Sequence, residues 1–137
     1  MIRVTVDTNI TVSGLLFGGL PLKVVRFALE KRFIWVTSPS LIDETERVLG
    51  SQKFGLSKHE VTALVSPIFD IAEIVVPQNE INVIHRCPAD NRVLECASEG
   101  RCTLIVTGDR RDLIALHIFQ GIQIITARQF IEIISHL

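Results

Sequence analysis

The stretch Val4-Thr5-Val6-Asp7-Thr8-Asn9 decides how the rest of the chain is interpreted. Residues 3–6 have the β-branched, largely apolar character of a buried strand, and the acid Asp7 follows this strand directly. Strands buried on both faces are typical of parallel sheets, whose ligand sites form beyond the carboxyl ends of the strands. Asp7 is therefore the first candidate for a functional residue.

Short apolar runs alternate with longer segments of helical periodicity along the whole chain. The expected strands are residues 3–6, 34–37, 73–76, 103–107 and 122–125. The expected helices are residues 20–32, 38–49, 57–72, 89–99, 109–119 and 127–135. This alternation predicts an α/β sandwich with a mainly parallel central sheet of about five strands. Because 137 residues are enough for one core, we expect a single domain over residues 1–137.

The composition argues against a disordered or membrane-spanning chain. Hydrophobic residues make up 47% of the sequence and charged residues 21%, as is typical of a folded protein. No apolar run approaches the roughly 20 residues that span a bilayer. Met1 leads directly into a strand, without the pattern of a signal peptide, so we expect a cytoplasmic protein.

Cysteine and histidine residues give little support to nucleophilic catalysis. The three cysteines contain no CxxC pair, and we expect buried free thiols at Cys87, Cys96 and Cys102. The four histidines lack metal-ligand spacing, and His117 is expected to pack inside an apolar helix. A catalytic Ser/His or Cys/His pair is therefore not indicated.

Two further acids are expected near the same edge of the sheet as Asp7. Asp109 ends the strand of residues 103–107, and Asp90 opens the helix that precedes it. If the first and fourth strands are neighbours, Asp7 and Asp109 point into one crevice. Asp90 or Asp109 alone is also explained as a helix cap, whereas Asp7 has no obvious partner for its charge. Clustered carboxylates repel one another unless a cation lies among them, so this pattern predicts Mg²⁺ or Mn²⁺ with oxygen ligands.

The helix of residues 38–49 offers a fourth acid, but its periodicity does not identify which one. The apolar residues that define its buried stripe are Leu41, Ile42, Val48 and Leu49. Glu44 and Glu46 lie on opposite borders of this stripe, equally far from its centre. Asp43 lies further out and is expected to be solvated.

Five segments, taken in order, resemble motifs of PIN-domain proteins, in particular PIN-domain toxins of toxin–antitoxin systems (VapC-like ribonucleases). They are Val6-Asp7-Thr8-Asn9, Ser38-Pro39-Ser40-Leu41-Ile42-Asp43-Glu44, Cys87-Pro88-Ala89-Asp90-Asn91 with Leu94 and Ala97, Val106-Thr107-Gly108-Asp109 with Asp112-Leu113, and Ile124-Ile125-Thr126-Ala127-Arg128-Gln129-Phe130. No single tetrapeptide is specific, and the order and spacing of all five carry the resemblance. The resemblance extends from end to end of the chain and implies a PIN-like three-layer α/β/α sandwich.

The resemblance also implies the composition of the site. The acids that it places together, as ligands of Mg²⁺ or Mn²⁺ and as catalytic residues, are Asp7, Glu44, Asp90 and Asp109. Asp112 is a possible fifth ligand, which also fits the first turn of its helix. Asn9 and Thr107 match polar positions that hold these carboxylates by hydrogen bonds. Many relatives carry Asp-Pro where this chain has Cys87-Pro88, and Cys87 supplies no hard oxygen ligand.

The implied activity is metal-dependent hydrolysis of RNA phosphodiester bonds, with an antitoxin protein as partner and a homodimer as assembly. Arg110 and Arg111 flank the expected site and could hold substrate phosphates, although a solvated helix start explains them equally well. The formal net charge is −1, but setting aside five clustered acids leaves 14 basic against 10 acidic residues. This balance permits a polyanionic substrate.

Three alternatives stay open. A catalytically degenerate PIN module would bind RNA or a protein partner, and Cys87 favours it slightly while the four intact acids count against it. A phosphatase or phosphotransfer domain also ends its first strand in Asp. The haloacid-dehalogenase type needs a second Asp where this chain has Asn9. A receiver domain needs an acidic pair and a strand-end lysine, and neither is evident in the sequence. A structure-specific DNA nuclease shares the metal chemistry, but the chain lacks inserted segments. Apolar residues in the 15–20 segment and on the long helices could form an antitoxin or homodimer interface.

Overall fold

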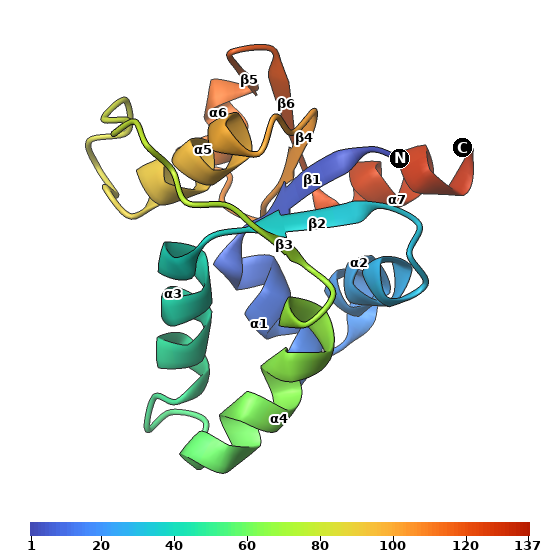
Figure 1. Cartoon of the computed structure of the whole chain (residues 1–137), viewed down its shortest axis with the longest axis vertical. Coiled ribbons are helices and arrows are strands. Elements are labelled where there is room, and N and C mark those ends of the chain that lie inside the picture. Colours follow the sequence, from blue (N-terminus) through green and yellow to red (C-terminus); the bar gives the residue numbers. More distant parts are fainter.

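A central sheet of six strands organises the chain in a computed structural model that describes all 137 residues (Figure 1). The strands are β1 (Arg3–Val6), β2 (Ile34–Thr37), β3 (Glu73–Ile74), β4 (Leu104–Val106), β5 (Ile118–Phe119) and β6 (Ile122–Ile125). Their order across the sheet is β3-β2-β1-β4-β6-β5, and only the β5–β6 pairing is antiparallel. The predicted α/β class with a mainly parallel sheet is confirmed, and β5 is the strand that the sequence did not predict.

The sheet reverses its direction of growth between β1 and β4. From β1 the chain builds β2 and β3 on one side, and then crosses over to build β4 and β6 on the other. Val6 pairs with Val106, so the residues that follow β1 and β4 leave the sheet at the same edge. The expected neighbourhood of these two strands is therefore confirmed, and a crevice at such a switch point is the common ligand position in open α/β sheets.

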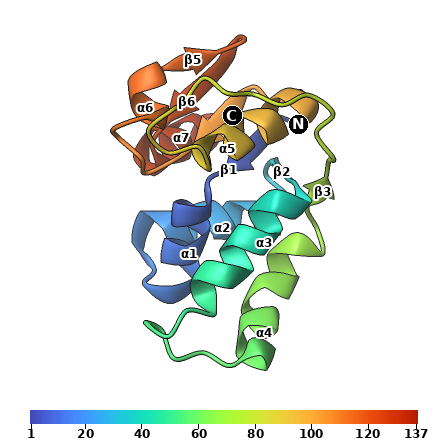
Figure 2. The same ribbon diagram turned by 90° about the vertical axis from the view of Figure 1, so that its left-hand side faces the viewer.

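Helices cover both faces of the sheet. The helices are α1 (Thr8–Leu16), α2 (Gly19–Leu29), α3 (Pro39–Leu49), α4 (Lys58–Phe69), α5 (Asp90–Glu99), α6 (Leu113–Leu116) and α7 (Ala127–Ser135). The larger core lies between the sheet and helices α1, α2 and α7, and contains Trp35 and Phe130. The second core lies between the sheet and helices α5 and α6, and the first turn of α3 reaches into it through Leu41. Figure 2 shows α1 to α4 grouped below β1 and β2, with α5 and α6 above them.

Local signals fix where several helices begin. The Ser38 hydroxyl accepts a hydrogen bond from the Leu41 N–H, and Pro39 occupies the first position of α3. Ser57 and Glu60 form a capping box at α4, as predicted for the Ser57 start. Because the start of α3 is fixed beside the end of β2, the middle of this helix faces the edge of the sheet where β1 ends.

Two helical regions differ from expectation. The sequence did not predict α1, which has close contacts with α2: a Cβ on Gly14 would lie 2.8 Å from the Pro21 carbonyl oxygen. The helix expected over residues 109–119 is wrong, because only α6 is helical there. Gln120 and Gly121 both have positive φ, 51° and 80°, and they turn the chain from β5 into β6 as a tight hairpin. His117 is exposed at the end of α6 and does not pack inside a helix.

Residues 78–88, called the strap below, run without regular structure past α5. The expected strand of residues 73–76 is shorter than predicted, because only β3 pairs with β2. In Figure 1 the strap connects the end of β3 to the start of α5. No single helix of the chain is long and apolar enough to span a membrane; α1 and α2 reach that length and composition only together, at a bend of 98°.

Candidate active site

The predicted acids gather at the edge of the sheet where β1 and β4 end. Asp7 follows β1, and Asp109 follows β4 after two residues. Asp90 is the first residue of α5, and Asp112 immediately precedes α6. Glu44 lies in the middle of α3, on the turn that approaches Asp7. The five acids therefore come from four separate segments, since Asp109 and Asp112 share the stretch after β4, and the sheet topology brings these segments to its switch point.

Asp7 is held by the sheet itself. Its side chain is buried, with 6% of the residue exposed, and the Thr107 hydroxyl donates a hydrogen bond to its Oδ2 at 2.7 Å. The same Thr107 oxygen accepts a hydrogen bond from the Asp109 N–H at 2.9 Å. Thr107 thus connects the two strand-end acids. The neighbouring Thr8 hydroxyl is also buried, and it has no hydrogen-bond partner.

The environment of Asp7 favours its protonated form. Burial is the main cause, and it raises the pKa of Asp7 to about 6, with smaller upward contributions from the charges of Glu44 and Asp109. The hydrogen bond from Thr107 opposes this shift in pKa, as does the Thr8 N–H. The carboxylate is therefore oriented but not neutralised by the protein around it.

Three carboxylates form the centre of the cluster. One oxygen each from Asp90, Asp109 and Asp112 lies within 4.8 Å of the others. The Asp109 Oδ1 also accepts hydrogen bonds from the N–H groups of Arg111 and Asp112, at 3.0 and 3.3 Å. These bonds fold residues 109–112 into a turn. They explain why the continuous helix expected from residue 109 does not form.

Asp90 has the least compensated charge of the cluster. Its Oδ2 is buried and has no hydrogen-bond partner. Burial, followed by the side-chain interaction with Asp109 and repulsion by the charges of Asp109, Asp7 and Asp112, raises the pKa of Asp90 to about 8. The alternative role of Asp90 as a helix cap is wrong, because Ala89 is the N-cap and Asp90 makes no capping bond. The capping alternative for Asp109 is correct in part, since its carboxylate accepts the turn N–H groups.

The cluster has the chemistry of a divalent cation site. Its donors are hard carboxylate oxygens, and a cation among them would remove the repulsion that adds to the effect of burial on the pKa values of Asp7 and Asp90. Asp90 Oδ2 is a buried acceptor that lacks any other partner. The residues present therefore fit Mg²⁺ or Mn²⁺.

Cys87 lies on the exposed rim of this cluster. The expectation of a buried thiol is wrong for Cys87, while Cys96 and Cys102 are buried as expected. Desolvation, followed by the charges of Asp90, Asp109 and Asp112, raises the pKa of the Cys87 thiol. Because a thiol must lose its proton to act as a nucleophile, this environment argues against covalent catalysis by Cys87.

The remaining predicted residues take varied positions. Glu44 lies close enough to Asp7 to raise its pKa, whereas Glu46 lines a hollow between α3 and α4. The Asn9 Oδ1 accepts a hydrogen bond from the Gly108 N–H at 3.2 Å, so Asn9 holds the β4 loop and not a carboxylate. Arg110 and Arg111 are both exposed on that loop.

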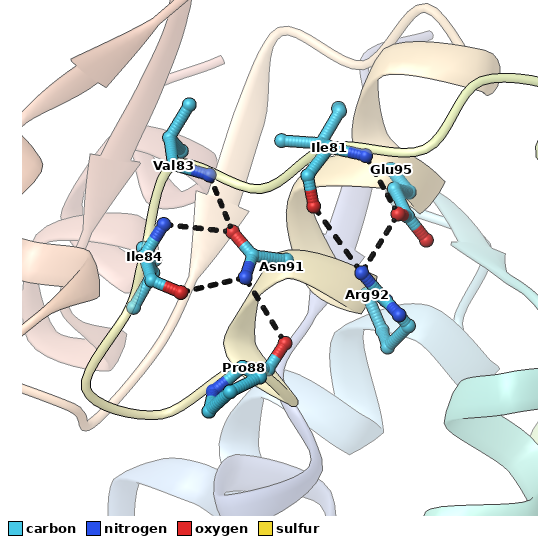
Figure 3. A network of polar contacts seen from close by, with 7 residues as sticks. All are labelled: Ile81, Val83, Ile84, Pro88, Asn91, Arg92 and Glu95. Carbon is cyan, nitrogen blue, oxygen red and sulfur yellow. Dashed lines mark hydrogen bonds and ion pairs between the residues drawn. The ribbon is translucent and has the colours of Figure 1, made fainter.

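Asn91 is a buried residue of this region for which no role was predicted. Its side-chain oxygen accepts hydrogen bonds from the Val83 and Ile84 N–H groups, at 3.1 and 2.9 Å (Figure 3). Its amide nitrogen donates to the Ile84 and Pro88 carbonyl oxygens, at 2.7 and 3.2 Å. The available signal was a polar residue on the buried face of α5, directly after a candidate ligand.

Two more side chains of α5 continue this attachment of the strap. Glu95 accepts a hydrogen bond from the Ile81 N–H at 2.8 Å, and Arg92 donates to the Ile81 carbonyl at 3.2 Å (Figure 3). Arg92 and Glu95 also form an ion pair. The strap is therefore fixed to α5 by side chains, in the helix whose first residue is Asp90.

Comparison with known proteins identifies the family. Residues 3–111 match the family model described as PIN domain. The chain belongs to the PIN domain family. The recognition from sequence motifs is confirmed, and PIN domains are generally nucleases, a chemistry that the acidic cluster suits.

This PIN domain is similar to several known proteins. Over 119 residues it is 29% identical to the uncharacterized protein MJ1680 of Methanocaldococcus jannaschii, an alignment that covers 84% of this chain and 75% of that protein. PAE2754 from Pyrobaculum aerophilum has a similar structure, with a TM-score of 0.69 at 12% identity over 99% of this chain and 91% of that one. VapBC2 from Rickettsia felis, solved with a DNA fragment from its promoter, gives a TM-score of 0.63 at 10% identity over 91% of this chain and 98% of that one. At such identities the two structural likenesses concern the fold, and they confirm the predicted PIN-like sandwich.

Proposed function

We propose that this PIN domain is a metal-dependent endoribonuclease and the toxin of a toxin–antitoxin pair. The observation that carries the nuclease proposal is the uncompensated Asp90 carboxylate, which lies among Asp109 and Asp112 with a buried oxygen that has no partner. A buried carboxylate oxygen without a hydrogen-bond partner is unfavourable, and a bound cation or substrate would supply the missing partner. Family membership supports hydrolysis of a phosphodiester bond as the reaction.

The proposed ligands of Mg²⁺ or Mn²⁺ are Asp7, Asp90 and Asp109, with Asp112 as a further carboxylate in reach. A divalent ion in such a site lowers the pKa of bound water and neutralises charge on the phosphate. Thr107 keeps Asp7 in one orientation, and so reduces the reorganisation needed on binding. Glu44, on α3 beside Asp7, is placed to orient the attacking water and to accept its proton.

Support for the toxin role is separate and rests on the fold. The structural likeness to VapBC2 and the motif resemblance to PIN-domain toxins favour an antitoxin protein as partner. The 15–20 segment contains Phe17, which is 71% exposed, and such a side chain suits an interface with an antitoxin or with a second copy. We therefore propose this segment as the contact for a homodimer or an antitoxin.

The first experiment measures cleavage of a mixed pool of structured RNAs by purified protein in Mg²⁺ and in Mn²⁺. EDTA, Asp7→Asn and Asp90→Asn are each expected to abolish cleavage, while the matched control Asp70→Asn, an exposed acid outside the cluster, keeps it. Calorimetric titration of metal runs in parallel on the same proteins. Cleavage that persists in EDTA, or in both site variants, would disprove the metal-carboxylate mechanism.

One observation favours a second function. Cys87 stands on the rim of the cluster where many relatives carry an acid, so the site has one carboxylate fewer than theirs. A degenerate PIN module that only binds RNA or protein would show neither cleavage nor metal binding in the same experiments. The toxin role itself is tested by growth arrest on expression, which Asp90→Asn should relieve.

A further inference from the structure

Two consecutive arginines line two different grooves beside the acidic cluster. Arg110 lines a groove of about 350 Å³ together with Arg128 and the apolar side chains of Leu20 and Pro21. Arg111 lines a second groove of about 340 Å³, together with Arg86 of the strap and His85. We call them the Arg110 groove and the Arg111 groove. Each has a volume at the lower end of the range for small-ligand sites, about 300–1,000 Å³.

The grooves meet the acidic cluster from opposite faces of the sheet. The Arg110 groove is built from α1, α2 and α7, the helices of the larger core, and includes Thr107, the partner of Asp7. The Arg111 groove is built from the strap and α6, which pack on the other face, and includes Asp112 itself. The turn of residues 109–112 therefore separates the grooves and carries acids of the cluster between them.

The arginines in these grooves have no partner within the protein. The guanidinium hydrogen bonds and ion pairs of the structure belong to Arg3, Arg32 and Arg92. The four groove arginines, Arg86, Arg110, Arg111 and Arg128, form none, although carboxylates are close by. Free guanidinium groups next to an acidic centre are available to bind the phosphates of a substrate, often in bidentate geometry.

The Asn91 network anchors the strap on both sides of Arg86. Asn91 holds the backbone of Ile84 through two hydrogen bonds and that of Pro88 through one, and Arg86 lies between them in the strap. The strap thus presents Arg86 toward Arg111 without any sheet pairing of its own. The Asn91 network, which makes no hydrogen bond with the acidic cluster, would thus hold the segment that carries Arg86.

We propose that the Arg110 and Arg111 grooves form one track for single-stranded RNA, which crosses the acidic cluster and is bound by phosphates on both sides of it. The inference rests on the proposed nuclease function and names how its substrate is held. Neither groove is lined by Phe, Tyr or Trp, and His85 is the one aromatic ring in reach of a base, so base stacking contributes little. The track therefore binds the backbone, with weak base preference and a strong dependence on salt.

The test measures RNA binding without cleavage. Each protein carries Asp90→Asn, and binding of a fluorescein-labelled oligouridine of about 12 nucleotides is followed by anisotropy from about 50 to 300 mM KCl. The variant pairs are Arg110→Ala with Arg128→Ala, and Arg86→Ala with Arg111→Ala. The matched control is Lys53→Ala with Lys58→Ala, two exposed cations, one in the turn between α3 and α4 and the other the first residue of α4. Thermal unfolding confirms that each protein is folded.

Each arginine pair is expected to weaken binding about tenfold near 0.1 M KCl and to reduce the slope of log affinity against log salt by about 1.4, two lost phosphate contacts. The lysine control keeps both values. Equal binding by the arginine variants and the control would overturn the proposal. An effect of only one arginine pair would disprove that RNA is bound on both sides of the acidic cluster. Tighter binding of the matching RNA duplex than of the single strand would also overturn it.

The same proteins separate this inference from the proposed function. If the nuclease function fails, the wild-type protein shows no metal-dependent cleavage, whatever the anisotropy shows. If the track fails, cleavage by the wild type persists while the arginine pairs leave binding unchanged. Arginine pairs made in the wild-type background, without Asp90→Asn, that bind and cleave RNA normally but no longer form a complex with an antitoxin would assign the grooves to a protein partner and overturn the RNA track.

Discussion

Asp7 and Asp90 meet at one site, but two differently built parts of the molecule hold them. Asp7 directly follows a central strand, and its nearest support is Thr107, which directly follows the neighbouring strand. Asp90 begins a helix whose side chains Asn91, Arg92 and Glu95 fasten an irregular strap. The first part relies on apolar burial and backbone pairing, while the second relies on side-chain hydrogen bonds.

The two parts therefore have different functions within one site, one to hold the acids in place and the other to surround them with charged side chains. The strand ends fix the acids that must not move, because a parallel sheet buried on both faces allows little adjustment. The strap and the turn of residues 109–112 present charged side chains around those acids. Each of the following changes affects one of the two parts, and together they test whether the parts act separately.

Replacing Asn91 by alanine should cost the most stability. The change leaves the N–H groups of Val83 and Ile84 and the Ile84 carbonyl without partners, while the Pro88 carbonyl still accepts the backbone N–H of residue 91. We expect a loss of about 3 kcal/mol in the free energy of unfolding. Urea denaturation measures this loss. Asn82→Ala, at an exposed residue of the same strap, serves as the matched control and should change stability by less than about 0.5 kcal/mol. Equal effects of the two substitutions would mean that the strap is not fastened by Asn91.

Thr107→Val should have the next largest effect and should act on the other part. It leaves Asp7 Oδ2 buried without a partner and removes the acceptor of the Asp109 N–H, at a cost of about 2 kcal/mol. Metal affinity, measured by calorimetry, should fall about 10- to 100-fold. Because the Thr107 hydrogen bond opposes the upward shift in the pKa of Asp7, this pKa should rise further in the variant. Thr103→Val, at an exposed position before β4, should leave metal affinity unchanged.

The metal-free protein should lose stability as the pH rises. Burial and mutual repulsion raise the pKa of Asp7 to about 6 and that of Asp90 to about 8, so the folded state binds protons more tightly than the unfolded state. This contribution is complete below about pH 4, the unfolded pKa, and is lost as the pH rises through about 6 and about 8. Mg²⁺ should restore much of it.

Asp90→Asn should therefore stabilise the metal-free protein at pH 8. Because solvent screens part of the repulsion, we expect a gain of about 1 kcal/mol, or about 3–5 °C in Tm, by calorimetry. Asp70→Asn, an exposed acid, should give no such gain. A lower Tm for Asp90→Asn at this pH would show that the Asp90 charge is compensated within the protein.

Cys87→Asp should have the smallest effect. Cys87 is on the exposed rim, so an added carboxylate should strengthen metal binding only about threefold and change stability by less than about 0.5 kcal/mol. Cys87→Ser, which adds an oxygen without a charge, is the control. An increase of 100-fold or more in metal affinity would instead mean that the present site is incomplete.

The parts of the fold that depend on local signals were predictable from the sequence. Strands β1, β2 and β6 and helices α3 and α7 lie where apolar runs and caps such as Ser38 place them. The meeting of Asp7 and Asp109 needed only the adjacency of two parallel strands, because both acids follow strand ends. The choice of Glu44 over Glu46 came from the family resemblance. Periodicity could not distinguish the two glutamates, because tertiary packing decides which border of the helix faces the other acids.

The missed elements lack such signals. Helix α1 contains several β-branched residues, which have low helix propensity. Its consecutive residues Ile10, Thr11 and Val12 are all buried, so the helix lacks the alternation of buried and exposed faces from which a helix is predicted. Residues 109–119 have helical composition, but the Asp109 carboxylate and the Gln120-Gly121 turn divide them between a short helix and a strand. The role of Asn91 depends on its hydrogen bonds to the strap, a segment that forms no helix or strand. In each case a contact with another segment overrides the local preference.

The strap has a consequence for how this protein can change over generations. Its backbone is bound by side chains of α5, so the residues that hold it and the residues that it displays are different ones. His85, Arg86 and Cys87 are exposed, and their side chains have no part in fastening the strap. Mutation can therefore alter this short surface beside the acids while the scaffold stays the same. A lineage that keeps Asn91 can explore new substrates or partners by exchanging only these neighbouring positions.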